Sequence, residues 1–175
     1  MPSISEFTQA LRSGVVRQHR WQVMVNFPTF AGSNSDVRQA SLLARTATTP
    51  ASTLGELDLV WAGRDVPIPG DRTFTEFPVT FMAVQDFKVI DAFENWSEGI
   101  NGSESNTASA APDEYKKDVV LQLLDENDNV LKEYVLQEAW IKEIAGMELD
   151  KGSKDSFAEF TVTFRYLQHS SNTTR

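Results

Sequence analysis

An Asp–Arg pair is the first stretch of this chain whose residue types and spacing could carry chemistry. Asp71 and Arg72 stand in "PIPGDRTFTEFPVTFMAV" (67–84), directly after a proline–glycine turn and before an alternating apolar run. A carboxylate can act as a general base, but it needs partners within hydrogen-bond reach of a reacting group. The sequence offers no base, nucleophile or metal ligand beside this pair. We therefore interpret it as structural.

The acidic run "DENDN" (125–129) has the composition of a calcium loop. Counted from Asp125, the sixth residue is Val130 and the twelfth is Leu136, whereas an EF-hand loop needs glycine and glutamate at these positions. Asn and Asp tolerate the positive-φ positions of tight turns. The run therefore predicts the turn of a β-hairpin and no calcium site.

The remaining ionisable candidates are scattered along the chain. His19 precedes the first expected strand and His169 lies near the C-terminus, so neither belongs to a metal-binding or proton-transfer cluster. Glu133, Glu138 and Glu143 lie in a strand-rich stretch. A glycosidase would need two carboxylates held close together, one of them with a raised pKa. We interpret these three as residues of solvated strand faces.

Signatures of the common enzyme classes are absent from the sequence, including G-x-S-x-G, H-E-x-x-H and the glycine-rich phosphate loops. The chain has no cysteine, which excludes disulfides, a thiolate nucleophile and a cysteine zinc site. Four aromatic side chains could line a ligand pocket: Trp21, Trp61, Trp96 and Trp140. Three of them lie in periodic apolar patterns typical of a core. We expect no enzymatic activity, no metal and no cofactor, and a binding or structural role.

Length and charge narrow the class of protein. A chain of 175 residues fits one domain, 1–175, with an extended or fraying tail at about 168–175. The net charge of −9 is concentrated in residues 88–175. This acidic excess argues against a sequence-reading nucleic-acid binder, which needs clustered Lys and Arg. It is compatible with a surface that DNA passes without sticking, and equally with an ordinary solvated surface.

Hydrophobic periodicity predicts a mainly β fold. Alternating apolar residues indicate strands at 21–27, 77–83 and 157–167, a hairpin over 118–144, and weaker strands at 37–46 and 54–63. Residues 64–70 can form at most an edge strand, with a corner at Pro67, Pro69 and Gly70. Helices are expected at 3–13 and after Asp86, which is the expected N-cap, with Val89, Phe93, Trp96 and Ile100 on one face. Together these elements predict an antiparallel β-sandwich or barrel with one flanking α-helix. No signal peptide or membrane span is expected.

The order of these pieces resembles the tail tube proteins of contractile-tailed (myovirus-type) bacteriophages. The most specific stretch is Gly70–Phe74 followed by an aromatic strand. It is followed by "YKK" (115–117) opening a strand and by "AWIKEIAGMELD" (139–150) before the last strand. "TATTP" (46–50) resembles the proline-containing turn of that family. The resemblance extends from about Trp21 to Leu167.

The resemblance implies a structural subunit that assembles with copies of itself. Six copies would form a ring, and stacked rings would form a hollow tube inside a contractile sheath, with baseplate and tail-terminator proteins at its ends. Double-stranded DNA would pass through the lumen without specific binding at ejection. The implied location is the virion tail, assembled in the cytoplasm of the bacterial host.

Segment 47–66 and the N-terminal segment are the expected contacts between rings. Within and beside the first, Pro50, Leu54 and Leu57 are expected to supply apolar docking area. Arg64, Asp71 and Arg72 are expected to form ion pairs, either within the subunit or between subunits.

Two alternatives remain open at the level of sequence. The chain could be the tube subunit of a phage-like injection or type VI secretion apparatus, which carries effectors instead of DNA. More remotely, it could be a monomeric β-barrel that binds an apolar small ligand. A single-chain barrel opens an aqueous channel only at about 16 strands. A chain of this length can enclose DNA only as part of an assembly.

Overall fold

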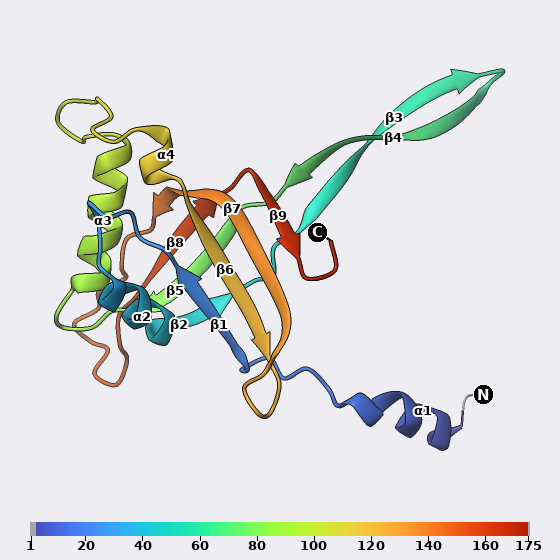
Figure 1. Cartoon of the computed structure of the whole chain (residues 1–175), viewed down its shortest axis with the longest axis horizontal. Coiled ribbons are helices and arrows are strands. Elements are labelled where there is room, and N and C mark those ends of the chain that lie inside the picture. The colour runs from blue at the N-terminus through green and yellow to red at the C-terminus, as the bar shows by residue number, and fades with distance from the viewer. Residues whose placement is uncertain (1–2, 175) are drawn as a thin grey trace.

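The computed structural model describes residues 3–174, so residues 1, 2 and 175 of the expected unit 1–175 lie outside the described part. The elements in chain order are α1 (Ile4–Ala10), η1 (Leu11–Ser13), β1 (Trp21–Val25), α2 (Asn34–Leu43), β2 (Ala44–Ala47), β3 (Ser52–Trp61), β4 (Arg64–Phe74), β5 (Phe77–Met82), α3 (Lys88–Ile100), α4 (Pro112–Tyr115), β6 (Lys117–Leu124), β7 (Val130–Ile144), β8 (Glu159–Arg165) and β9 (Gln168–Ser171). Figure 1 shows a body of β-sheet with α2, α3 and α4 gathered on one side. Two thin projections leave the other side, the β3–β4 hairpin and the N-terminal segment that carries α1.

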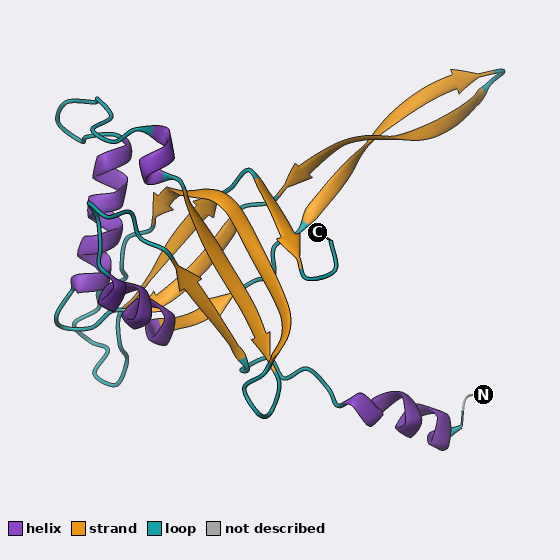
Figure 2. Ribbon diagram, viewed as in Figure 1, coloured by secondary structure: helices purple, strands orange, loops and turns teal. Residues whose placement is uncertain are grey.

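The body is an antiparallel sheet folded back on itself. Its strand order is β1-β6-β7-β8-β5-β2, and β9 also pairs with β7. The long strand β7 belongs to both halves, because Tyr134–Gln137 pair with β9 and Trp140–Ile144 pair with β8. Between these parts Glu138 adopts a positive φ of 52°, and its N–H donates to the carboxylate of Asp118 at 3.1 Å. This bulge bends β7 and lets the halves face each other. The expected mainly β fold is confirmed (Figure 2).

The core follows from strict alternation along the strands. In β5, Phe77, Val79 and Phe81 are buried and their neighbours point outward, and β8 repeats the pattern. Phe93 from α3 lies between the halves, with ring centroids 4.9 Å from Phe27 and 5.1 Å from Phe81. Such offset aromatic contacts add to the gain from burial.

Helix α3 covers this core with the apolar face that the sequence predicts. Val89, Phe93 and Trp96 are buried, and the Trp96 Nε1–H donates to the carbonyl of Tyr115 at 2.8 Å. The helix begins at Lys88 after Phe87, which has a left-handed φ of 52°, so the expected cap at Asp86 is wrong.

Helix α2 corrects the strand expected at 37–46. The Ser33 N–H donates to the Asp36 carboxylate at 2.7 Å, which closes the first turn and lowers the pKa of Asp36. Val37, Ala40 and Leu43 then follow one another at three-residue intervals along α2 and pack against the core. Only the last residues, 44–47, form a strand, β2, beside β5.

The C-terminal segment is also better ordered than expected. Residues 168–171 form β9, Ser171 is buried, and Tyr134 pairs with Ser171 across the strands. The expectation of a fraying tail is therefore wrong for 168–171. The expected N-terminal helix is confirmed, with Ser3 as its cap and Gly14 after its end.

Candidate assembly interfaces

The β3–β4 hairpin is a two-stranded ribbon that pairs with no other strand of the described chain. β4 continues from Arg64 to Phe74, so the expected corner at Pro67, Pro69 and Gly70 is wrong. The register instead shifts near Gly55 and Gly70, where the two backbones approach so closely that a Cβ on Gly70 would meet the Gly55 carbonyl at 3.2 Å. The prolines are tolerated because each strand of a two-stranded ribbon is an edge.

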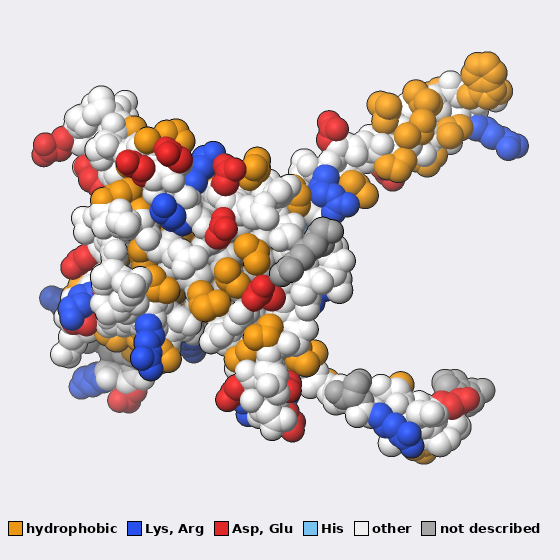
Figure 3. Space-filling model, viewed as in Figure 1, with side chains coloured by type: hydrophobic (Ala, Val, Ile, Leu, Met, Phe, Trp, Pro, Cys, Tyr) orange, Lys and Arg blue, Asp and Glu red, His pale blue; other side chains and the backbone are white. Residues whose placement is uncertain are grey.

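The hairpin has two chemically different faces. Side chains alternate, and the pairs Leu57–Ile68 and Leu59–Val66 together with Trp61 form one side, which we call the apolar face. The pairs Glu56–Pro69, Asp58–Pro67 and Val60–Asp65 form the opposite side, which we call the acidic face. Figure 3 shows hydrophobic side chains along the hairpin. Trp61, at the tip, is 79% exposed, which is unusual for a residue of its size.

The three residues expected to supply apolar docking area, Pro50, Leu54 and Leu57, lie in different environments in the structure. Leu57 lies on the apolar face and is exposed. Leu54 is also exposed but lies beyond the bulge, on the side that continues the acidic face. Pro50 is buried within the subunit, so it offers no docking area. Arg64 sits at the exposed tip, paired in register with Trp61.

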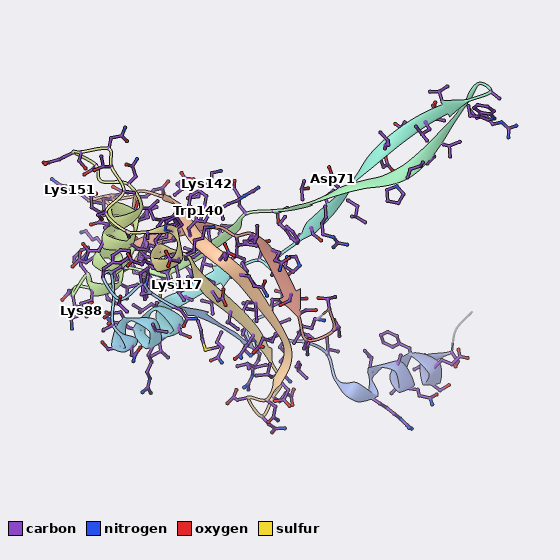
Figure 4. The ribbon with its side chains drawn as sticks, turned by 45° about the horizontal axis from the view of Figure 1, so that its top comes forward. Asp71, Lys88, Lys117, Trp140, Lys142 and Lys151 are labelled. Atoms are coloured by element: carbon purple, nitrogen blue, oxygen red, sulfur yellow. The ribbon has the colours of Figure 1, made fainter. Side chains whose placement is uncertain are left out.

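Asp71 and Arg72 form no ion pair with each other among the described residues. Arg72 donates from Nη1 to the Ser52 hydroxyl at 3.0 Å across the hairpin. Figure 4 places Asp71 on the hairpin, away from the labelled lysines of the body. Arg72 therefore braces the ribbon rather than a turn, and Asp71 stays a candidate for pairing with another subunit.

An aromatic cluster holds the root of the hairpin. The Phe74 ring at the end of β4 lies edge-on to His169 of β9 at 5.2 Å and tilted to Tyr166 at 6.0 Å. Arg165 donates to the Phe74 carbonyl at 3.3 Å. Burial, with a smaller contribution from the charge of Arg72, lowers the pKa of His169. A neutral imidazole fits this cluster, which ties the hairpin to the C-terminal strand.

The N-terminal segment is the second projection. No residue of α1 is buried, although Ile4, Phe7 and Leu11 form one apolar stripe along it. Its base is fixed to the β6–β7 turn, where Arg17 pairs with Glu126 at 2.5 Å and Arg20 with Asp128 at 2.8 Å. We call residues 3–16 the arm.

The outer face of β9, β7, β6 and β1 carries rows of amide side chains. Gln22 donates to Gln122 and Gln122 donates to Glu133, both at 2.6 Å, across three strands. Gln168 donates to Gln137 at 2.7 Å. We call this surface the amide face. Its positions on these strands include the carboxylates of Asp118 and Glu133 and no Lys or Arg, and at its edge Lys116, directly before β6, pairs with Glu138 at 2.9 Å.

The opposite half of the body has a more charged outer face. Arg45 pairs with Glu159 there, and Lys142 pairs with Glu76. Thr80 and Thr161 share a hydrogen bond at 3.0 Å between these charges. The two outer faces of the body therefore differ in basic character.

The other chemical candidates form no site. Asp125 accepts from the side-chain amide and the backbone N–H of Asn129 and from the backbone N–H of Asn127, which lowers its pKa and shapes the expected hairpin turn. No group of three or more potential metal ligands occurs within residues 3–174. Across the same residues, no helix has both the length and the apolar character of a membrane span.

The tryptophans do not line one pocket. Trp96 lies in the core, Trp61 at the hairpin tip, and Trp21 and Trp140 are half-buried on β1 and β7. The expectation of three core tryptophans holds fully for Trp96 alone. The structure therefore gives the aromatic ligand pocket of the monomeric alternative no support.

The family model of the phage tail tube protein matches residues 16–172, which include all the strands and the hairpin. The chain belongs to this family. As a phage tail tube protein it is a structural component of contractile tails and of the virion.

Individual relatives agree with this assignment. The tail tube protein of Serratia phage KSP90 is 48% identical over 177 residues, which cover all of both chains. Tail tube protein gp19 of Enterobacteria phage T4 is 25% identical and covers 91% of this chain and 94% of its own. A chain in the anti-feeding prophage baseplate has a TM-score of 0.68 at 16% identity, covering 90% of this chain and 95% of that one, which shows a shared fold.

Proposed function

We propose that this tail tube protein assembles into hexameric rings that stack into a hollow tube, and that the tube conducts the DNA genome at ejection. The observation that carries the proposal is the full-length similarity to a phage tail tube protein, combined with a subunit in whose described residues the hairpin pairs with no other strand and α1 buries no side chain. The baseplate that contains the similar fold is described as six-fold symmetrised, which supports six copies in a ring.

The hairpin is suited to contacts between rings. Its apolar face exposes leucine, valine, isoleucine and tryptophan side chains to solvent in the isolated subunit. Covering this face with a second copy removes apolar area from water. Because the contact joins different surfaces of two copies and does not close on itself, it repeats and builds a filament. Leu57, Arg64 and Asp71 are the interface candidates on this element, with Leu54 near its root.

The amide face is suited to line the lumen. Each phosphate that a Lys or Arg neutralises adds affinity for DNA, and a conducting wall must avoid such retention. The opposite outer face carries Arg45, Lys142 and Arg165, whereas the strand positions of the amide face hold no Lys or Arg and Lys116 at its edge is neutralised by Glu138. Six copies contributing four strands each would give a wall of about 24 strands, well beyond the ~16 that an aqueous channel needs.

The proposed role requires no catalysis and no cofactor. The tube would lie inside a contractile sheath and meet baseplate and tail-terminator proteins at its ends. Assembly would take place in the cytoplasm of the bacterial host. All 175 residues would act as one unit.

Electron cryo-microscopy of the purified, concentrated protein tests the proposal. We expect hollow filaments with six subunits per ring and the amide face inward. A chain that remains a monomer of about 20 kDa in light scattering at every concentration would refute it. Loading the tubes with DNA or with acidic protein then distinguishes a DNA conduit from an effector conduit.

A further inference from the structure

We propose that the arm of one copy packs onto the apolar face of the hairpin of the next copy along the tube. This inference rests on the proposed stacking of subunits and names the two surfaces that meet. The arm and the hairpin are the two projections of the described chain, and each exposes an apolar surface that its own subunit leaves uncovered.

The two surfaces match in chemistry. On the arm, Ile4 is 86% exposed and Phe7 is 66% exposed, and Leu11 extends the same stripe by one turn. On the hairpin, Leu57, Leu59 and Ile68 lie together on the apolar face and are exposed. An amphipathic helix laid on this face buries both apolar surfaces, as in the helix-in-groove mode of recognition.

The two projections are placed for a head-to-tail contact. In Figure 1 the hairpin leaves the upper right of the body and the arm leaves the lower right, so both extend on the same side from opposite ends. A copy stacked above therefore brings its arm down toward the hairpin of the copy below. Since every copy offers both surfaces, the contact repeats without closing.

Charge favours the same pairing. The arm, residues 3–16, carries one acid, Glu6, and one arginine, Arg12. Arg17 and Arg20 at its base are paired with Glu126 and Asp128 of the same subunit. The hairpin, residues 52–74, carries four acids and two arginines. Arg12 lies in η1, two residues after α1 ends, so it can reach a carboxylate of the hairpin when the apolar surfaces meet. The net negative charge of the hairpin disfavours hairpin-to-hairpin contacts, whereas the arm has no net charge to repel it.

The helix is preformed for this contact. The Ser3 N–H donates to the Glu6 carboxylate at 2.7 Å and the Glu6 N–H donates to the Ser3 hydroxyl at 3.3 Å, which is a capping box. Such caps stabilise the first turn of a short helix that buries none of its side chains within its own subunit. The arm therefore loses less conformational entropy on docking than an unstructured segment would.

Cysteine cross-linking tests the contact directly, because the natural chain has no cysteine. The double variant Phe7→Cys/Leu59→Cys places one thiol on the arm and one on the apolar face. Tubes of this variant are treated with a short bis-maleimide and separated under denaturing conditions. We expect a ladder of dimers, trimers and higher species, since each copy links to two others.

The matched control is Phe7→Cys/Val60→Cys, whose second thiol lies on the acidic face one residue away. We expect at least a tenfold weaker ladder from it. A second pair, Ile4→Cys/Ile68→Cys, repeats the test at another point of the same surfaces. Tubes that yield no ladder from either apolar-face pair, or an equal ladder from the control, would overturn the inference while leaving the proposed function standing. If the natural chain forms no tubes, the proposed function and the inference both fail.

Discussion

The two faces of the hairpin predict unequal effects on assembly from the same substitution at neighbouring positions. Leu59 lies on the apolar face and is 48% exposed, whereas Val60 lies on the acidic face and is 73% exposed. Leu59→Asp should strongly weaken tube assembly, and Val60→Asp should leave it nearly unchanged. Exposure alone would predict the reverse order, because Val60 has more surface left to bury.

The expected size of the effect follows from the area that remains to be covered. Complete burial of a leucine side chain contributes about 1.5–3 kcal/mol, so covering the remaining half of Leu59 contributes roughly 1 kcal/mol. An unpaired polar group in that apolar contact adds a further cost of about 1–3 kcal/mol, and a carboxylate costs at least as much. A total of about 2–4 kcal/mol corresponds to a rise of about 30- to 1,000-fold in the concentration needed for assembly.

The assay is the concentration at which tubes begin to pellet in the ultracentrifuge, measured for both variants and the natural chain. Circular dichroism and the thermal midpoint of the dissociated subunit show whether each variant is folded. Val60→Asp should shift the threshold by no more than about twofold, as most surface substitutions do. Equal shifts for the two variants, or a shift below about threefold for Leu59→Asp, would refute the assignment of the faces.

Three further outcomes are expected. Phe93→Ala removes a fully buried ring from contact with Phe27 and Phe81, and should lower the free energy of unfolding of the dissociated subunit by about 3–5 kcal/mol in urea titrations. Gln122→Lys places a cation on the amide face and should make tubes retain DNA at low salt and release it as salt rises, whereas Gln85→Lys, before α3, should not. The pKa of His169 is lowered in the folded chain, so below pH 6.5 the unfolded chain binds more protons at this residue than the folded chain does. The free energy of unfolding therefore falls as pH falls, and His169→Phe should remove this loss.

Each of these three has a result that contradicts it. A stability loss below about 1 kcal/mol would show that the cavity left by Phe93 collapses at little cost. Equal DNA retention by Gln122→Lys and Gln85→Lys tubes would show that the amide face does not line the lumen. The carboxylates with lowered pKa, Asp36 and Asp125, titrate below their ordinary value of 3.8. An unchanged pH dependence of unfolding between pH 6.5 and 5 in His169→Phe would therefore exclude His169 as its source.

The elements with strong periodicity were predictable from the sequence. β5 and β8 alternate apolar and polar residues without interruption, and α3 repeats its apolar residues every three to four positions. The strand prediction for segment 37–46 is wrong because the apolar residues of this segment fit a short strand as well as a helix. The segment forms a helix because Ser33 and Asp36 cap its first turn and because α2 packs against β1. Residues 168–171 have no alternating apolar pattern, so the sequence does not predict β9. Backbone pairing with β7 stabilises this strand instead.

The interface residues were predictable only in part. The sequence places Leu54 and Leu57 close together, yet three residues along a strand put them on opposite faces, and the bulge separates them further. The alternation of Leu57, Leu59 and Trp61 against Val66 and Ile68 was a usable signal for the apolar face. The amide face left no such signal, since its glutamines meet only after strands distant in sequence come together.

Small rotations at the aromatic root of the hairpin are amplified at its tip. Ten residues of extended strand reach about 34 Å from the root, so turning the root by about 5° displaces the tip by about 3 Å. Phe74, Tyr166 and His169 thereby fix the direction in which each subunit reaches for the next. Small repacking at this point, far from any contact between copies, would change the twist and pitch of the whole filament.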